Sequence, residues 1–138
     1  MIYDNPWTYN GTHVTDADAV GLVGFVYLIE NLTTGRKYIG KKRFFFTKTR
    51  TVKKKKKREK VISDWKEYYG SNKELQADVE RLGGDMFSRK ILYMCTTLGE
   101  CSYYEAYEQF TCGVLLSDDY YNGFIGCKIS TSHLPKRK

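Results

Sequence analysis

The stretch GFVYLIENLTTGRKYIGKKRFFF, residues 24–46, decides the local fold of this chain. Residues 25–29 are β-branched and aromatic, as is the segment around Tyr38, and NLTTGR between them has the composition of a hairpin loop. We therefore predict two antiparallel strands joined by a turn. Each strand carries one tyrosine, Tyr27 and Tyr38, and a cluster of cations follows the second strand at once.

The length of 138 residues fits one domain with one core. We predict an N-terminal arm over residues 1–23, a core over 24–128 that contains a basic loop at about 41–63, and a basic tail over 129–138. The sequence has no apolar run of membrane-spanning length, and its start, MIYDNPWTYNG, lacks the features of a secretory signal. We expect a soluble, cytoplasmic protein with no membrane partner.

The positive charge is concentrated in one segment. The net charge is +7, and residues 36–66 contain 15 Lys or Arg against Glu59 and Asp64, so the rest of the chain is acidic. Such a block most often binds nucleic acid, although an acidic protein, a membrane surface or solvent alone are alternatives. The run of lysines at 53–57 favours an inserted loop or a long hairpin.

The cysteines predict neither a metal cage nor a disulfide framework. They are spaced 6, 11 and 15 residues apart, with no C-x-x-C pair and only two histidines in the chain. We expect reduced thiols that mostly pack in the core. The four are Cys95, Cys101, Cys112 and Cys127.

Two capping boxes predict helices in the second half of the chain. In each box a hydroxyl residue precedes a glutamate by three positions: Ser71 with Glu74, and Thr97 with Glu100. We expect the first helix to end at Gly83 and the second near Cys112. Residues 86–94, between the helices, have the composition of a third strand.

The paired segments VYLI and KYIG resemble the two halves of the signature of the GIY-YIG nuclease family. Tyr27 occupies the position of the first tyrosine, with Val26 in place of the isoleucine, and residues 38–40 match YIG. The resemblance extends over roughly residues 24–128, and the segment SDWKEYYGS is similar to one in the small stand-alone phage-encoded members.

The resemblance implies a compact α/β (α+β) domain with a small three-stranded antiparallel sheet flanked by helices. It also implies a metal-dependent DNA endonuclease, which would act in the cytoplasm of a host cell if it is phage-encoded. Mg²⁺ is the expected metal, with Mn²⁺ able to substitute. The alternatives are a catalytically inactive DNA-binding module with the same fold, and an interaction protein that grips an acidic partner.

The resemblance implies roles for both tyrosines. Tyr27 would take the proton of the attacking water, which requires nearby cations to lower its pKa from about 10. Lys41, Lys42 and Arg43 are the cations expected to do this. Tyr38 would hold the water or a phosphate oxygen.

The position of the family's arginine is the main departure from the pattern. Some members carry a site lysine where Lys41 stands, but the arginine position falls on Lys48, where no helical pattern is apparent. Lys42, Lys48, Arg43 and Arg50 are all candidates. We favour Arg43 because it is nearest to the predicted strand.

The second predicted helix offers the metal ligand. Glu105 fits the family's pattern best, with Glu108 in reserve, whereas Glu100 is used as a cap. A single carboxylate with water in the remaining positions suits Mg²⁺. Asn122 matches an asparagine that supports the site in the family, although an Asn-Gly turn is the alternative.

The basic segment is expected to contact DNA phosphates without reading sequence. Trp65, Tyr68 and Tyr69 could stack on bases, but core packing is the more frequent use of such aromatics. Few residues follow the core, so we expect a stand-alone nuclease that is weakly specific, selects DNA structure, or takes its specificity from a homodimer or a partner protein. The predicted DNA-binding residues are Lys42, Lys48, Arg50, Lys53, Lys54, Lys55, Lys56, Lys57 and Arg58.

Overall fold

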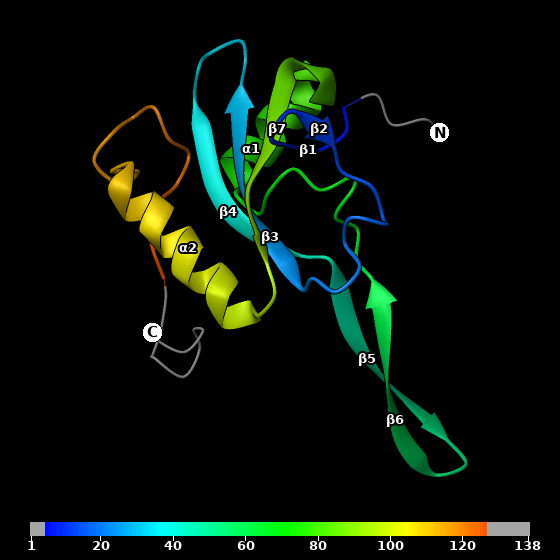
Figure 1. Ribbon diagram of the computed structural model, residues 1–138. Coiled ribbons are helices and arrows are strands. Elements are labelled where there is room, and N and C mark those ends of the chain that lie inside the picture. The colour runs from blue at the N-terminus through cyan, green and yellow to red at the C-terminus, as the bar shows by residue number, and fades with distance from the viewer. Residues whose placement is uncertain (1–4, 127–138) are drawn as a thin grey trace.

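The computed structural model describes residues 5–126 of the chain. In chain order, its elements are β1 (Thr8–Tyr9), β2 (Thr12–His13), β3 (Gly24–Asn31), β4 (Lys37–Arg43), β5 (Phe45–Val52), β6 (Lys55–Ile62), α1 (Lys73–Leu82), the 3-10 helix η1 (Gly84–Met86), β7 (Phe87–Cys95) and α2 (Leu98–Thr111). The larger sheet has the strand order β2-β1-β7-β3-β4, and β5 and β6 form a separate ribbon that projects from the body (Figure 1).

The predicted hairpin is confirmed and becomes the centre of the sheet. β3 and β4 are antiparallel, with Tyr27 opposite Gly40 and Ile29 opposite Tyr38. On its other side β3 pairs antiparallel with β7, the predicted third strand. The turn uses Gly35, whose φ of 78° suits glycine. β4 is therefore the last strand of the larger sheet, and among the described residues its outer side is bridged only at Lys37, by the segment around Tyr120.

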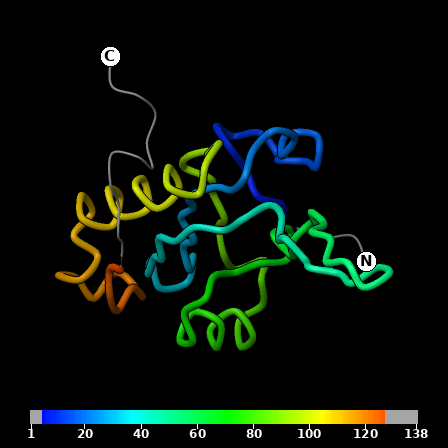
Figure 2. Tube along the Cα trace, turned by 90° about the horizontal axis from the view of Figure 1, so that it is seen from below, coloured from blue at the N-terminus to red at the C-terminus, as the bar shows by residue number. Residues whose placement is uncertain are grey.

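The two faces of the sheet bury different clusters. Phe25, Tyr27 and Ile29 pack on one face with the α1 side of the molecule, whereas Val26 and Ile39 pack on the other with α2. Figure 2 shows the two helices on opposite sides of the strands. This alternation follows from the two-residue period of a strand. It places the two signature tyrosines and α2 on different faces, so that they can meet only at the β4 edge.

The α+β class is confirmed, but the sheet is larger than predicted. The N-terminal arm contributes two short strands: β1 pairs parallel to β7, and β2 pairs antiparallel to β1. The sheet is therefore mixed and five-stranded, where three antiparallel strands were expected. Strands of two residues carry too little pattern to be predicted. The arm is fixed by Trp7, which is buried and whose Nε1 donates to the Trp65 carbonyl at 2.6 Å.

Both predicted helices form, and one cap differs. In α2 the Thr97 side chain accepts from the Glu100 backbone N–H at 3.0 Å, as predicted. In α1 the N-cap is Asn72, whose Oδ1 accepts from the Leu75 N–H at 2.9 Å. The prediction of Ser71 as the cap was wrong, because asparagine caps at least as well as serine and stands one residue closer to the helix. Ser71 is left free to point elsewhere.

The basic segment forms the β5–β6 ribbon, which decides between the predicted loop and hairpin in favour of the hairpin. Its turn is made by Lys53 and Lys54, which both have positive φ, of 49° and 64°. No helix of the described residues is long and apolar enough to cross a membrane. Residues 1–4 of the predicted arm, the end of the predicted core and the whole predicted tail lie outside the described residues.

Three thiols fall in the described range, and all are free. Cys95 and Cys101 are buried, as predicted, whereas Cys112 is exposed. Cys127 lies outside the described residues.

A buried arginine fixes the segment that leads into α1. Arg89 of β7 is 2% exposed, and its Nη1 donates to the carbonyls of Lys66 and Tyr68 at 2.9 and 2.8 Å. Its Nη2 donates to the carbonyl of Asn5. One planar fork of donors therefore ties the N-terminal arm and the segment around Tyr68 to the sheet. This bond network sets where Tyr68 packs.

Candidate active site

A cavity of about 280 Å³ lies at the β4 edge. β4, the start of α1, α2 and the C-terminal segment all contribute to it, so residues far apart in the sequence meet there. Its lining residues are Tyr38, Ser71, Asn72, Glu105, Gln109, Asn122, Gly123, Phe124 and Gly126. Two of the predicted site residues from the hairpin and α2, Tyr38 and Glu105, thus share one hollow.

Tyr27 lies behind this cavity. It is 1% exposed, and its ring packs against those of Trp7, Tyr38 and Tyr68 at centroid distances of 5.2, 6.1 and 5.9 Å. Its phenol runs over Gly40, where a Cβ would stand 2.7 Å from Cζ of Tyr27. Cβ atoms essentially never approach that closely, so the phenol can reach the β4 edge only over a glycine.

The surroundings of Tyr27 raise its pKa well above the ordinary value. Burial is the largest cause, and Tyr68, Tyr38 and the Glu105 carboxylate add to it. The prediction that neighbouring cations lower this pKa was wrong for the protein without ligands. The phenol therefore keeps its proton and can act as a hydrogen-bond donor.

The three cations after the signature point in different directions, which explains this result. Lys42 shares the face of Tyr27, but its ammonium is paired with Asp64 at 2.6 Å and lies over the Tyr68 ring. The pairing also lowers the pKa of Asp64, through the hydrogen bond from Lys42. Arg43 lines a separate cavity at the base of the ribbon. Neither cation therefore offers unpaired charge to the phenol.

Lys41 is the cation that the fold brings to the candidate site. Its Nζ lies 4.0 Å from the Glu105 carboxylate and donates to Oγ of Ser102 at 2.6 Å. The carboxylate is mostly buried, and burial raises the pKa of Glu105, whereas the charge and the backbone N–H of Lys41 lower it in part. A carboxylate and an ammonium group thus sit together where α2 passes the β4 edge.

Tyr38 reaches the same cavity from the strand. Its hydroxyl is hydrogen-bonded to Oγ of Ser71 at 3.1 Å. Burial raises the pKa of Tyr38, although the bond to Ser71 works against it. This contact explains why Ser71 does not cap α1. It also brings the Ser71 hydroxyl to the site, which the prediction of Ser71 as a cap did not include.

Asn122 lines the cavity, but both polar atoms of its side-chain amide bond to the backbone of β4. Its Oδ1 accepts from the Ile39 N–H at 3.1 Å and its Nδ2 donates to the Ile39 carbonyl at 2.8 Å. The same carbonyl accepts from Nε2 of Gln109 at 2.9 Å. Two buried amides thus hold the edge strand between Tyr38 and Gly40. Asn122 was predicted as a supporting residue; Gln109 was missed, although it stands four residues after Glu105 on α2.

Glu108 lies away from this group. It accepts a hydrogen bond from the Tyr93 hydroxyl on β7 at 2.6 Å. Glu105 and Glu108 are three residues apart on one helix, yet only the first reaches the β4 edge. The ribbon residues that were predicted to bind DNA lie on β5, β6 and their turn, outside the cavity.

The residues that form this site belong to a known protein family. The family model described as "Putative endonuclease segE, GIY-YIG domain" matches residues 7–125. The chain belongs to this GIY-YIG family. The match begins at Trp7, so it includes most of the arm that supplies β1 and β2. No curated protein and no solved structure matches the chain.

Membership of the GIY-YIG family implies a nuclease, and thus a DNA substrate. The signature now has a physical meaning in this chain: the rings of the two tyrosines pack against each other in a tilted arrangement, and the glycine of YIG makes room for the first of them. The strand that carries the second tyrosine, β4, is fixed at Ile39 by the amide of Asn122.

The residues of the GIY-YIG site offer oxygen donors of the kind that the metal implied by the family prefers. No group of three or more His, Cys, Asp or Glu that could hold a metal occurs among the described residues. Glu105 supplies one carboxylate, and the hydroxyl-bearing residues Tyr38 and Ser71 line the same hollow. Asn72 also lines it, but its Oδ1 caps α1 at the Leu75 N–H. This set of hard oxygen donors fits Mg²⁺, which retains several waters, and does not fit zinc.

Proposed function

We propose that this chain is a metal-dependent DNA endonuclease that hydrolyses phosphodiester bonds at the β4 edge. The observation that carries the proposal is that Glu105 and Tyr38 line one cavity, while the ammonium group of Lys41 lies 4.0 Å from the Glu105 carboxylate. The ring of Tyr27 packs against that of Tyr38 beside this cavity. Hydrolysis of a phosphodiester needs a nucleophilic water, stabilisation of the charge that develops on the phosphate, and help for the leaving oxygen. The residues at this edge supply groups of those kinds.

Glu105 is the residue proposed to hold Mg²⁺, with Mn²⁺ able to substitute. When bound, the ion would acidify water and stabilise negative charge on a phosphate oxygen. Glu105 suits this role because its carboxylate is fixed on a helix and faces the cavity beside Lys41. Its raised pKa reflects burial, which is also the setting in which a cation is most favourable.

Lys41 is proposed to stabilise the phosphate. Its ammonium group keeps partial exposure and lies at the rim between Ser102 and Glu105. An ammonium group in this position can pair with a non-bridging oxygen of the attacked phosphate. Lys41 thus keeps in this proposal the part of a site lysine that the resemblance implied for it.

The two tyrosines are proposed to orient the reacting groups. Because Tyr27 keeps its proton in the free protein, we assign it a hydrogen bond to the phosphate or to the attacking water. Acceptance of the water's proton requires a lower pKa than the surrounding residues provide. Tyr38, which shares its hydroxyl contact with Ser71, positions the water or the leaving oxygen.

A second candidate function is a DNA-binding module that has lost catalysis. One observation favours it: none of the described residues that line the Glu105 cavity is an arginine. In that case the fold and the basic ribbon are retained for binding alone.

Supercoiled plasmid distinguishes the two functions. The endonuclease proposal predicts nicked or linear product with Mg²⁺ or Mn²⁺, no product with a chelator, and strong loss of product with Tyr27→Phe. A module predicts retention of the plasmid in a gel without any cut product. Neither cleavage nor retention at low salt contradicts both.

A further inference from the structure

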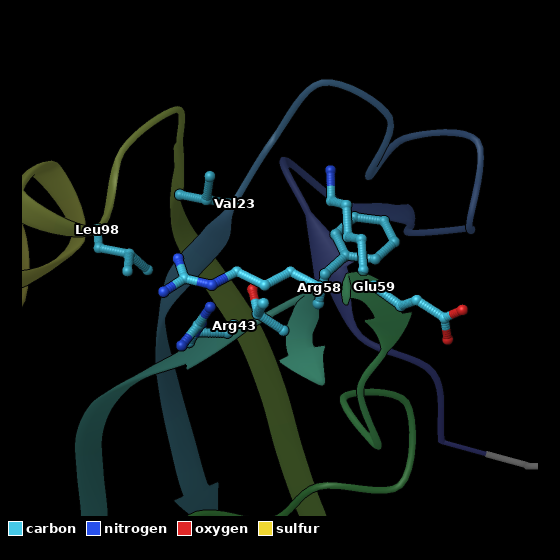
Figure 3. A pocket seen from close by; sticks show the side chains of 8 residues that line it. Val23, Arg43, Arg58, Glu59 and Leu98 are labelled. Carbon is cyan, nitrogen blue, oxygen red and sulfur yellow. The ribbon is translucent and has the colours of Figure 1, made fainter. Parts of the chain in front are cut away.

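A second cavity, of about 350 Å³, lies at the base of the ribbon. It opens between the last residue of β4, both ribbon strands and the start of α2, away from the Glu105 cavity. Arg43, Arg58 and Lys60 line it, together with Thr47 and Leu98. Figure 3 shows the side chains of Arg43 and Arg58 reaching into the same space beside Leu98 and Val23.

These cations have no acidic partner at this place. None of Arg43, Arg58 and Lys60 forms an ion pair with any described residue. Glu59 is also part of the lining, but its carboxylate pairs with Arg50 at 2.9 Å and points away from the two guanidinium groups in Figure 3. Like charges gathered without a counter-charge repel one another, and a bound anion relieves that repulsion. The cavity has the chemistry of a phosphate site.

The pairing of β5 with β6 shows which basic residues of the ribbon lie on the same face as this cavity. Residues directly opposite in an antiparallel pair share a face. One face, the threonine face, pairs Thr47 with Lys60, Thr49 with Arg58 and Thr51 with Lys56. The other, the mixed face, pairs Lys48 with Glu59, Arg50 with Lys57 and Val52 with Lys55.

The two faces have the same net charge, so they differ in how the charged side chains are arranged on them. The mixed face has one more cation but also holds the acid, and Glu59 occupies the middle of it in an ion pair with Arg50. The threonine face has cations at three alternate residues of β6, Lys56, Arg58 and Lys60, each opposite a threonine, and no acid. Hydroxyl and basic side chains are the groups that contact the DNA backbone.

The threonine face and the cavity are continuous. Phe45 is on this face, and Nζ of Lys60 lies 4.3 Å from its ring centroid. This contact fixes the side-chain direction of Lys60 toward the cavity that Arg43 and Arg58 also line. The mixed face leads instead to Phe46, over which Lys42 lies, and Lys42 is already paired with Asp64.

We propose that the threonine face and the cavity at its base bind the DNA backbone, with one phosphate seated between Arg43 and Arg58, while the mixed face points to solvent. The inference rests on the proposed function, because DNA is taken as the substrate. It gives Arg43 a role in binding, apart from the groups around Glu105. A two-stranded ribbon is narrow enough to follow a groove of duplex DNA while making such contacts.

Two matched triple variants test the choice of face. Lys56→Gln with Arg58→Gln and Lys60→Gln removes two lysines and one arginine from the threonine face. Lys48→Gln with Arg50→Gln and Lys57→Gln removes the same residue types from the mixed face. Binding is measured by fluorescence anisotropy on a labelled duplex over a salt series, with a chelator present so that no cleavage occurs, and thermal melts check folding.

The proposal predicts that the threonine-face variant binds at least about tenfold more weakly and that the slope of log K against log salt falls by about three. The mixed-face variant should change binding less than about threefold. Equal losses, or a larger loss from the mixed face, overturn the proposal. Arg43→Gln should weaken binding and reduce the slope by about one, unlike the matched Arg50→Gln; an unchanged affinity overturns the phosphate site.

Cleavage of plasmid by the wild-type chain separates this inference from the proposed function. Cleavage together with wild-type binding by the threonine-face variant overturns the inference and leaves the endonuclease proposal standing. A wild-type chain that binds no DNA overturns both.

Discussion

The phenol of Tyr27 lies against Gly40, directly across the β3–β4 pair. The glycine of the YIG segment is thus not a turn residue. It stands in the middle of β4, where its missing side chain leaves the space through which Tyr27 extends toward the sheet edge. Gly70 flanks the same phenol from the segment before α1, where a Cβ would lie 3.5 Å from the hydroxyl.

Gly40→Ala should therefore displace Tyr27 from the site. A methyl group at position 40 would stand 2.7 Å from Cζ of Tyr27 and 3.0 Å from Cε2 of Tyr38. We expect a loss of about 1–3 kcal/mol in the free energy of unfolding, as for an overpacked core. Urea denaturation followed by circular dichroism measures the loss, and cleavage of plasmid should fall with it.

A double-mutant cycle tells whether the contact with Tyr27 is the cause. Leucine at position 27 is too short to reach over position 40, so Gly40→Ala should cost less in a Tyr27→Leu background. The same cost in both backgrounds would show that the methyl group disturbs something else.

Asn122→Asp should loosen the edge strand. The substitution removes the N–H group that donates to the Ile39 carbonyl at 2.8 Å and places a carboxylate beside that oxygen. We expect a loss of about 1–3 kcal/mol in the free energy of unfolding. Asn10→Asp, at an exposed turn, makes the same chemical change and should have almost no effect. Equal denaturation midpoints for the two variants would contradict the proposed support of β4.

The hairpin, both helices and the third strand could be predicted from the sequence because each has its own local signal. Alternating apolar residues, capping residues and glycines report on chain segments of about ten residues. The pairing of β1 with β7 has no such signal, because it depends on Trp7 reaching the Trp65 carbonyl. Ser71 was misread for a related reason: its sequence context fits a cap, and only the fold shows Tyr38 beside it.

The site residues divide in the same way. The family motif was enough to predict Tyr27, Tyr38, Glu105 and Lys41 as site residues. It contains no information about which side chains the fold buries beside them. The pKa of Tyr27 was expected to fall because cations follow in the sequence. In three dimensions Lys42 and Arg43 point to Asp64 and to the ribbon cavity, and burial raises the pKa instead.

Arg89→Met should destabilise the whole domain. The buried guanidinium group holds the carbonyls of Lys66, Tyr68 and Asn5, which would lose their donors inside the protein. We expect a loss of at least about 3 kcal/mol in the free energy of unfolding. Arg81→Met is the matched control, because Arg81 is exposed on α1 and should cost less than about 1 kcal/mol. Urea titrations that give similar values for both would refute the role of Arg89.

Asp78 should make the stability of the fold depend on pH in the acid range. The hydrogen bond from the Tyr121 hydroxyl, and then that from Arg81, lower the pKa of Asp78. A carboxylate with a lowered pKa stabilises the fold above its ordinary pKa of about 4, and the contribution is lost as the pH falls through the folded-state value. The stability difference between the wild type and Asp78→Asn should be constant near neutral pH and shrink below about pH 4. A difference that persists unchanged at the lowest pH would argue against this linkage.

The roles of two glutamates on one helix test the central claim most directly. Glu105 lines the cavity at the β4 edge, whereas Glu108, three residues later, does not line it and accepts a hydrogen bond from the Tyr93 hydroxyl on β7. The measurement is the rate of plasmid nicking with Mg²⁺ by Glu105→Gln and Glu108→Gln at enzyme excess. The account predicts a fall of at least about a hundredfold for Glu105→Gln and a near wild-type rate for Glu108→Gln. Cleavage by Glu105→Gln at the wild-type rate, or the reverse order of the two variants, would contradict it.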